Sequence, residues 1–433
     1  MKFGNYLSSK NGIGALATDI ASLEKKVVPR LNVLALSYLF PNTAQPAYGI
    51  FVLNRLKAIH KYCDVNVIAP IQWYPFIHHV RGAMRGPGVL RSTEIEGLAV
   101  FHPRFVVLPR FMKWIDAITF WISARSVVKK QSMLQTFKYD LVDVHWTYPD
   151  IVAGYLLAKR RNKKFIVTIR GHEALYDNES SLRRWLVAYF LRKADFVITL
   201  SDELRDKVIG LGIAAEKSKT VLNGVDIQHF RPLNRDECRR QVGVPIDSKV
   251  MVSVGRVTEG KGHQDLVRIM PSLNKCGSVE LYIIGGVNPE DDFTHTLHKM
   301  IADLNLKNVH LVDSVSHDQL PLWYSAADLF CLASKREGCP NVVLEALACG
   351  TPVVVTNVGS VSELIVPGEN GALVELAQLD SLGQVVSSAL EKSWDRTRIA
   401  ARMANWGWDA CAVRVVEIYE SLLGKDRKGL VQQ

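Results

Sequence analysis

Several features that would point to particular classes of function are missing from this chain. No apolar run reaches the length of about 18 residues that a membrane-spanning helix needs, and Met1–Lys26 contain no continuous apolar stretch. We therefore expect neither a spanning helix nor a secretory signal. The seven cysteines are scattered, odd in number and never spaced C-x-x-C. This pattern predicts reduced thiols in a cytosolic protein, and neither a disulfide framework nor a zinc site.

The motifs of nucleic-acid-binding proteins are also missing. There is no paired Cys/His finger spacing and no aromatic run of the RNA-recognition type, so we expect no nucleic acid as a partner. The positive charge is unevenly spread: residues 1–210 hold 30 Lys and Arg against 16 Asp and Glu, a balance of +14, and the remainder holds 23 against 27, a balance of −4. Only the first half is therefore expected to meet a polyanion, such as an anionic membrane or a phosphorylated acceptor.

What the chain does contain is a strand-and-helix alternation that occurs twice over its 433 residues, a length that suits two domains. Apolar, β-branched runs separated by helical stretches predict parallel strands at 31–38, 63–70, 139–146, 163–170 and 194–201, and again at 219–226, 249–256, 279–286, 308–314, 328–334 and 351–357. The fold class predicted is α/β, with two doubly wound Rossmann-like domains. Residues 406–423 follow as an amphipathic helix.

The segment 328–357 carries the most chemical information. It reads as strand, polar loop, helix and strand, with Pro340 and Asn341 at the helix start, where free N–H groups suit a phosphate. Glu337 in the loop and Glu345 in the helix would repel that phosphate unless each faces hydroxyl groups beside it. A sugar on one side and a ribose on the other describe a nucleotide diphosphate sugar. The alternative is an ordinary capped helix with solvated glutamates.

A second loop, at 253–267, offers two cations after a predicted strand. Gly255-x-x-x-x-Gly260-Lys261 resembles a phosphate-binding P-loop, but the next position is Gly262, where magnesium binding needs Ser or Thr. Arg256 can instead grip phosphate oxygens as a fork while Lys261 adds a point charge. No Asp-x-Asp pair occurs in the chain. We therefore expect a diphosphate held by side chains, with no metal ion and no cofactor besides the co-substrate.

Taken together, these motifs resemble those of the family-four retaining glycosyltransferases with GT-B architecture. The resemblance rests on E-G-C-P-N-V-V-L-E at 337–345, G-R-x-x-x-x-K-G at 255–262, N-G-V-D at 223–226, P-x-x-G-I-F-V at 46–52, V-H-W-T-Y-P-D at 144–150 and T-I-R-G-H-E at 168–173. Among relatives, the chain is most similar to the bacterial exopolysaccharide and teichuronic-acid-type transferases. The resemblance extends from residue 31 to residue 423.

The resemblance implies two domains that face each other across a cleft. Residues 31–212 would bind the acceptor and residues 213–404 the donor, residues 405–433 would form a helix that crosses back to the first domain, and residues 1–30 would be an extension.

The resemblance also implies a role for each matching position. Glu345 would hold the donor ribose, Glu337 would lie beside the sugar hydroxyls, Arg256 and Lys261 would stabilise the leaving diphosphate, and Gly49 would allow close backbone approach to donor and acceptor. The backbone near the sugar and diphosphate would come from Gly338, Cys339, Pro340, Asn341 and Val342.

One position departs from the family pattern. Many relatives carry a His that touches the donor sugar where this chain has Arg170, and His172 follows two residues later. Either side chain is a candidate for that contact. The alternative is that Arg170 binds an acceptor phosphate and His172 only lines the cleft.

The function implied is retaining, metal-independent transfer of a sugar to a lipid-linked or polysaccharide acceptor in bacterial surface polysaccharide biosynthesis. A uridine diphosphate sugar is the expected donor, with a guanosine diphosphate sugar as second choice. Two alternatives stay open at this point. One is a nucleotide-sugar epimerase of the same architecture, and the other is a membrane-bound partner that binds the nucleotide sugar without turnover.

A candidate membrane contact lies at 104–138. Apolar residues follow helical spacing there, with cations around them, which suits the interface of an anionic leaflet. The apolar positions are 111, 114, 115, 118, 121 and 122, and the cations are Arg110, Lys113, Arg125, Lys129 and Lys130. We therefore expect a cytoplasmic protein that is peripheral on the inner face of the membrane. The alternative is a helix packed on the first domain's sheet.

Overall fold

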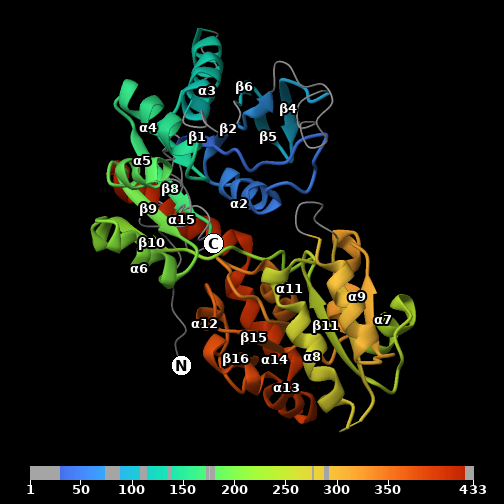
Figure 1. Ribbon diagram of the computed structural model, residues 1–433. Helices are drawn as coiled ribbons and strands as arrows, with labels where there is room; N and C mark the ends of the chain where they lie inside the picture. Colours follow the sequence, from blue (N-terminus) through green and yellow to red (C-terminus); the bar gives the residue numbers. More distant parts are fainter. Residues whose placement is uncertain are drawn as a thin grey trace, which may run out of the picture.

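The chain folds into two α/β domains, each built on its own sheet (Figure 1). This computed structural model describes residues 30–73, 88–107, 115–133, 138–171, 175, 181–275, 277–286 and 292–424. Strands alternate with helices in both domains, and the predicted α/β class with two Rossmann-like domains is confirmed.

The N-terminal domain has an eight-stranded sheet in the order β10-β9-β8-β7-β1-β2-β5-β4, in which only β4 runs antiparallel to its neighbour. Its strands are β1 (Asn32–Leu36), β2 (Asp64–Ile68), β4 (Ser92–Ile95), β5 (Leu98–Phe101), β7 (Leu141–Val144), β8 (Lys164–Ile169), β9 (Phe196–Thr199) and β10 (Ser218–Thr220). A separate pair consists of β3 (Ile71–Trp73) and β6 (Arg104–Val106). The helices are α2 (Ile50–His60), α3 (Ile115–Met133), α4 (Asp150–Arg160), α5 (Ser181–Leu191) and α6 (Asp202–Gly210).

Both faces of this sheet are covered, which explains why the central strands are apolar along their whole length. Phe120 of α3, Leu157 of α4 and Val187 of α5 belong to one buried cluster. Leu56 of α2 belongs to another, which also contains residues of the C-terminal helix. Because β7 and β8 run parallel, their carboxyl ends meet at one edge of the sheet, where side chains from different loops come together.

The domain boundary expected at 212/213 is placed too early. β10 pairs in parallel with β9, Ser218 opposite Val197, and so belongs to the first sheet. The apolar, β-branched run at 219–226 predicts a strand that opens the second domain, but only its first two residues form strand. The crossing to the second domain therefore follows Thr220.

The C-terminal domain has a six-stranded, fully parallel sheet in the order β13-β12-β11-β14-β15-β16. Its strands are β11 (Lys249–Val254), β12 (Val279–Ile284), β13 (Val309–Val312), β14 (Leu329–Leu332), β15 (Val353–Thr356) and β16 (Gly371–Val374). Its helices are α7 (Arg235–Val242), α8 (His263–Leu273), α9 (Thr294–Asp303), α10 (Leu320–Ala326), α11 (Asn341–Ala348), α12 (Val361–Leu364), α13 (Leu382–Glu391) and α14 (Arg396–Arg402).

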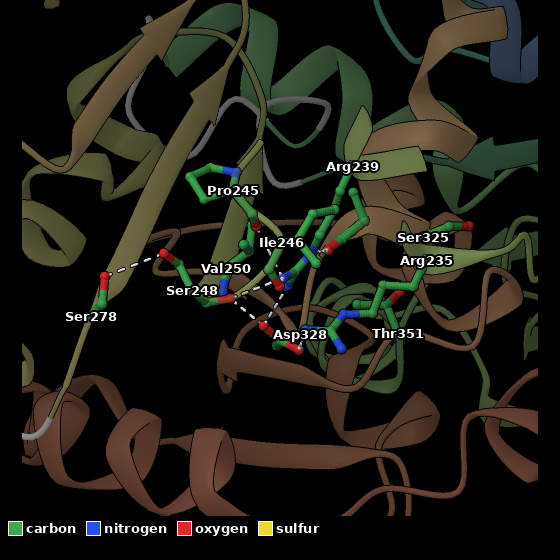
Figure 2. A network of polar contacts seen from close by, with 12 residues as sticks. Arg235, Arg239, Pro245, Ile246, Ser248, Val250, Ser278, Ser325, Asp328 and Thr351 are labelled. Atoms are coloured by element: carbon green, nitrogen blue, oxygen red, sulfur yellow. Dashed lines mark hydrogen bonds and ion pairs between the residues drawn. The ribbon is translucent and has the colours of Figure 1, made fainter. Parts of the chain in front are cut away.

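A buried arginine fixes the start of β11 in this domain (Figure 2). The Arg239 guanidinium donates to the carbonyl oxygens of Pro245, Ile246 and Ser248 at 3.1, 2.6 and 2.9 Å. It also donates to Asp328 Oδ2 at 2.8 Å, and the same oxygen accepts the amide of Val250 at 2.8 Å. Because the charge is paired and each carbonyl is satisfied, the network holds the turn before β11 against β14.

The last helix, α15 (Trp408–Leu423), leaves the second domain and packs on α2 of the first. Val415 and Ile418 join the cluster on that face of the first sheet. The Tyr419 hydroxyl donates to Asp143 in β7, and both side chains are buried. The helix therefore ties the two domains together covalently and by packing.

The expected membrane segment is described only in part. Residues 108–114, with Arg110 and Lys113, lie outside the described residues. α3 buries Ala117, Phe120 and Ala124 against the sheet, while Ile118 and Ile122 are 43% and 54% exposed. The buried face agrees with a helix packed on the first domain's sheet, and a membrane contact by the exposed face stays a prediction. Among the described residues, no helix is both long and apolar enough to cross a bilayer.

Candidate active site

The loop after β11 brings the expected cations to the carboxyl edge of the second sheet. Arg256 is exposed, and Lys261 ends a short 3-10 turn that begins at Glu259. Gly262 follows with φ of 71°, and a Cβ there would lie 1.8 Å from the carbonyl oxygen of Ala333. Only glycine fits this position, because the backbone is left-handed and the β14 chain end lies directly against it. The loop is thereby pressed against the chain that leads to Glu337.

Lys261 and Glu337 form the central contact of the site. Lys261 Nζ lies 2.6 Å from Glu337 Oε1, and their side chains are 26% and 11% exposed. The Ser334 hydroxyl donates to the same oxygen at 2.7 Å. A charge-assisted hydrogen bond of this length positions both groups. Within the part of the chain that the structure describes, both bonds use Oε1, which leaves Oε2 to accept from a ligand hydroxyl.

The helix after Glu337 begins where the sequence predicts. α11 starts at Asn341, with Pro340 as its N-cap residue and no side-chain cap. The amides of Asn341 and Val342 have no intrahelical acceptor, since the first N–H groups of a helix lack one. They point towards the loop and give that end of the helix a partial positive charge. With Lys261 beside it, this is a site for an anionic group.

Glu345 lies one turn into α11 and is held by a buried tyrosine. The Tyr324 hydroxyl donates to Glu345 Oε2 at 2.8 Å, and His317 Nε2 lies 4.0 Å from Oε1. Burial raises the pKa of Glu345 to about 7, although the hydrogen bond from Tyr324 works in the opposite direction. A ligand hydroxyl that donates to this carboxylate would favour its charged form.

The loop before α11 touches the first domain. A Cβ on Gly338 would lie 2.2 Å from the carbonyl oxygen of Arg170, and one on Gly359 would lie 2.6 Å from the carbonyl oxygen of Gly338. Cys339 packs against the cores of both domains, and burial raises the pKa of its thiol to about 11. The loop is therefore held between two domains by close backbone contact, and the thiol is unsuited to act as a nucleophile.

Arg170 is buried in a polar network, and its guanidinium does not project freely into solvent. It is 7% exposed and donates to His145 Nδ1 at 2.8 Å and to Asn223 Oδ1 at 3.3 Å. His145 Nε2 lies 3.1 Å from Asp143 Oδ2. Burial holds the pKa of Arg170 well below its usual value. Its guanidinium carbon also lies 5.2 Å from the ring of Phe51. These contacts assign Arg170 to the junction between the domains.

Gly49 and His172 complete the predicted positions. Gly49 has φ of 71°, and a Cβ there would lie 2.5 Å from the carbonyl of Leu39. The glycine is therefore required by the neighbouring backbone at the start of α2, independently of any ligand. His172 lies outside the described residues.

One group of described side chains has donors placed for a metal ion. Ligand atoms of His229, His317 and Asp318 lie within 4.8 Å of one another, beside Glu345. The two imidazole rings are stacked, with planes 7° apart and centroids 5.2 Å apart. His229 Nε2 lies 3.3 Å from the carbonyl oxygen of His317 and 3.8 Å from Asp318 Oδ1, so the three residues also contact one another directly.

Sequence reasoning missed several residues that hold this site. Tyr324 orients Glu345, Ser334 orients Glu337, and Asn223 bonds Asn341 across the domain junction at 2.9 Å. The motif N-G-V-D at 223–226 did mark Asn223, but nothing in the spacing indicates its partner. The contacts of Tyr324 and Asn223 join residues 21 and 118 positions apart, so a local sequence pattern does not reveal them, whereas Ser334 lies only three residues before Glu337.

Two family models together match most of the chain. Residues 63–229 match the model described as Glycosyltransferase Family 4, and residues 234–406 match the model described as Glycosyl transferases group 1. The junction between the matches falls in the segment that joins the two domains.

Individual proteins give the same result. The chain is 25% identical over 340 residues to the putative teichuronic acid biosynthesis glycosyltransferase TuaC of Bacillus subtilis, a match that covers 77% of this chain and 83% of TuaC. It is 28% identical over 359 residues to an uncharacterised glycosyltransferase of Methanocaldococcus jannaschii, with 79% and 90% covered. Among solved structures, sucrose-phosphate synthase from Thermosynechococcus elongatus shares the fold with a TM-score of 0.73, 19% identity, and 92% and 100% coverage. HepE of Anabaena, solved with UDP, has a TM-score of 0.70, 19% identity, and 90% and 100% coverage.

Proposed function

We propose that this chain, which belongs to the glycosyltransferases of group 1 and family 4, moves a sugar from a nucleotide diphosphate sugar to an acceptor with retention of configuration and without a metal ion. The observation that carries the proposal is the contact of Lys261 with Glu337 at the uncapped start of α11, with Glu345 one turn further on. Cation, helix end and two carboxylates match the diphosphate, the sugar and the ribose of such a donor.

In this proposal the donor is held without a metal. The diphosphate lies against the amides of Asn341 and Val342, with Lys261 and Arg256 beside it. The ammonium of Lys261 has three donors, so it can keep Glu337 Oε1 and still bind a phosphate oxygen. Glu337 Oε2 then accepts from a sugar hydroxyl, and Glu345 accepts from the ribose.

Catalysis consists of stabilising the leaving group. As the glycosidic bond to the diphosphate breaks, negative charge grows on the phosphate oxygens, and in this proposal Arg256, Lys261 and the end of α11 stabilise that charge. The acceptor hydroxyl attacks from the same face, and its proton passes to a diphosphate oxygen. No separate general base is then needed.

The acceptor and setting are proposed from the relatives. TuaC is named for teichuronic acid biosynthesis. For this chain we propose a lipid-linked or polysaccharide acceptor in bacterial surface polysaccharide synthesis. A uridine diphosphate sugar is the proposed donor. We place the protein in the cytoplasm, peripheral on the inner face of the membrane, because the first half of the chain has a charge balance of +14.

The test is turnover with a panel of donors. Wild-type protein is incubated with UDP-glucose, UDP-N-acetylglucosamine, UDP-galactose and GDP-mannose in EDTA, and release of the nucleoside diphosphate is measured with and without membrane extract as acceptor source. The proposal predicts acceptor-dependent release from one donor, and a product with the donor's anomeric configuration by NMR. An inverted product would reject the retaining mechanism, and interconversion of the donor sugars without nucleotide release would identify an epimerase.

A further inference from the structure

The outward face of α5 carries an aromatic and apolar stripe that the core does not use. Leu182, Trp185 and Tyr189 are 48%, 55% and 37% exposed and follow one another at three and four residues, so they share a face. The rings of Trp185 and Tyr189 are stacked, 5.4 Å apart and 19° inclined. The opposite face buries Val187 and Leu191. Exposed large apolar side chains gathered on one helix mark an interaction surface.

Cations surround this stripe. Residues 181–193 read SLRRWLVAYFLRK, with four basic residues and no acidic one. Arg184, Arg192 and Lys193 are exposed, and Lys193 Nζ lies 5.5 Å from the ring centre of Tyr189. An apolar stripe with aromatic rings and flanking cations is the composition that anionic lipid surfaces attract.

A basic cavity of about 580 Å³ lies at the end of the stripe. Four lysines line it: Lys159, Lys163, Lys164 and Lys193. Its two carboxylates are already engaged, since Asp195 pairs with Lys164 at 2.9 Å and Asp140 accepts the amide of Asn32 at 3.0 Å. Among the described residues, no carboxylate lies within ion-pair distance of the other three lysines. With four lysines against two carboxylates, the lining has a charge balance of +2, which suits an anion.

The stripe and the cavity form one surface on neighbouring helices. Lys193 belongs to both, because it lines the cavity and lies over Tyr189. Behind them α4 packs on α5 (Figure 1). The ring of Tyr155, which also lines the cavity, lies 5.3 Å from that of Phe190. A flat partner that meets the stripe can therefore place an anionic group in the cavity.

We propose that this surface docks the protein on an anionic phospholipid membrane. Leu182, Trp185 and Tyr189 enter the lipid interface, and the lysines of the cavity hold the phosphate of a lipid headgroup. The inference rests on the membrane localisation in the proposed function, and it moves the main membrane contact from α3 to α5. Its weight rests on charge complementarity, since a surface with four lysines and exposed rings suits a negatively charged, apolar layer.

The position of α5 links docking to the site. α5 connects β8 to β9, so its first residues lie at the carboxyl edge of the sheet, where Arg170 follows β8. The Arg183 guanidinium carbon lies 5.4 Å from the ring of Tyr148, which follows β7 at the same edge. The cavity lies at the other end of α5, beside the first residue of β8 and the residue before β9. A membrane along the stripe therefore extends from the cavity, at the amino edge of the sheet, towards the first residues of α5 at its carboxyl edge.

The test is co-sedimentation of the full chain with phosphatidylcholine vesicles that contain or lack phosphatidylglycerol, at low and high salt. Wild-type protein is expected to bind only the anionic vesicles, and less at high salt. Lys159→Glu, Lys163→Glu and Lys193→Glu together should lower the partition coefficient by at least about fivefold for each lysine. Trp185→Ser with Tyr189→Ser should lower it about tenfold.

Matched variants separate docking from general effects. Lys249→Glu, Lys275→Glu and Lys307→Glu make the same charge change at exposed sites on the second domain and should leave most binding in place. The variant that combines Ile118→Ser with Ile122→Ser tests whether the exposed face of α3 contributes to vesicle binding. The proposal would be overturned if the two triple lysine variants lost vesicle binding equally. It would also be overturned if only the α3 variant lost vesicle binding.

Two further outcomes would replace the membrane as the partner. Calorimetric binding of inorganic phosphate or glycerol phosphate to the cavity without vesicle binding would identify a soluble anion site. A concentration-dependent dimer that is lost in Trp185→Ser with Tyr189→Ser would identify a contact between two copies. Donor-induced thermal shifts, measured on every variant, keep this test separate from that of the transferase activity, because none of these residues contacts the proposed donor site.

Discussion

Asn223 and Asn341 join the two domains through a side-chain hydrogen bond: Asn223 Nδ2 donates to Asn341 Oδ1 at 2.9 Å. Asn223 lies in the segment between the domains, and Asn341 is the first residue of α11. The Oδ1 of Asn223 accepts from Arg170 at 3.3 Å and from Arg55 at 3.5 Å. Asn223 thus connects two buried arginines of the first domain to the start of α11, where the donor diphosphate is proposed to bind.

Replacing Asn223 should separate these two roles. Asn223→Ala leaves both buried guanidinium groups short of an acceptor, and should lower the free energy of unfolding by about 1–3 kcal/mol. Asn223→Asp keeps the acceptor for the arginines but loses the donor to Asn341, so it should fold near normally and still lower kcat. Urea unfolding and steady-state kinetics check this. Equal kinetics for Asn223→Asp and wild type would show that the bond to Asn341 does not position the helix.

Glycine at 338 should be needed for the contact between the domains. A Cβ there would lie 2.2 Å from the Arg170 carbonyl oxygen, so Gly338→Ala must push the two backbones apart. We expect kcat/KM to fall by tenfold or more, about 1.4 kcal/mol. The matched control is Gly260→Ala, in the neighbouring loop, where a Cβ meets nothing within 4 Å. If the two variants have the same kcat/KM, the close backbone approach at Gly338 is not needed for activity.

Lys261 should dominate the stabilisation of the leaving group. Lys261→Ala removes the cation next to Glu337, and should lower kcat about 10²–10³-fold, the range for loss of one transition-state donor. Lys335→Ala removes a comparable cation from an exposed ion pair with Glu259 and should change little. Nucleotide release under donor saturation measures both. An unchanged rate in Lys261→Ala would remove this residue from the mechanism.

The pKa of Glu345 gives the protein a pH signature. Because the folded-state pKa is raised to about 7 from 4.5, the stabilising contribution of the protonated carboxyl is complete below pH 4.5 and lost as the pH rises through about 7. Glu345→Gln keeps an acceptor for Tyr324 and cannot ionise. Relative to wild type, the free energy of unfolding of the Glu345→Gln variant should rise by about 1–3 kcal/mol as the pH increases from the lower to the upper of these two values.

The same substitution should weaken donor binding. Ribose hydroxyls donate to a carboxylate, so wild-type donor affinity should fall as the pH drops below about 7, and the Glu345→Gln variant should bind weakly at every pH. Glu363, whose pKa burial also raises to about 7, titrates in both proteins and cancels in the comparison. Titration calorimetry and thermal unfolding across this pH range test the pair of expectations. A pH-independent difference in stability would contradict the assignment of this titration to Glu345.

The fold could be predicted largely because buried parallel strands have a strong local pattern. The run at 249–256 contains β11 and the run at 351–357 contains β15, since each is apolar on both faces and ends at a loop. β10 shows the limit of this reasoning. Two of its three residues, Lys219 and Thr220, fall in the run at 219–226 that looks like the start of the next repeat, and only the tertiary pairing with β9 assigns β10 to the first sheet.

The site could be predicted where one segment carries the chemistry. The start of α11 and the positions of Lys261 and Glu337 follow from local signals. Arg170 could not be placed in the same way, because its neighbours His145 and Asn223 come from other strands and from the domain junction. From the sequence alone, a cation at the end of a strand is interpreted as a ligand-binding group, because its contacts within the protein are not known.

Donor binding in the absence of metal is the most direct test of the proposed mechanism. Thermal unfolding of wild type and Lys261→Ala is measured in EDTA and then in magnesium, with UDP-glucose, UDP-N-acetylglucosamine, UDP-galactose, GDP-mannose and ATP. We predict that sugars of one nucleotide raise the wild-type melting temperature equally in EDTA and in magnesium, and that Lys261→Ala loses most of this rise. A rise that needs magnesium, or that only ATP produces, would contradict a donor site held by side-chain cations.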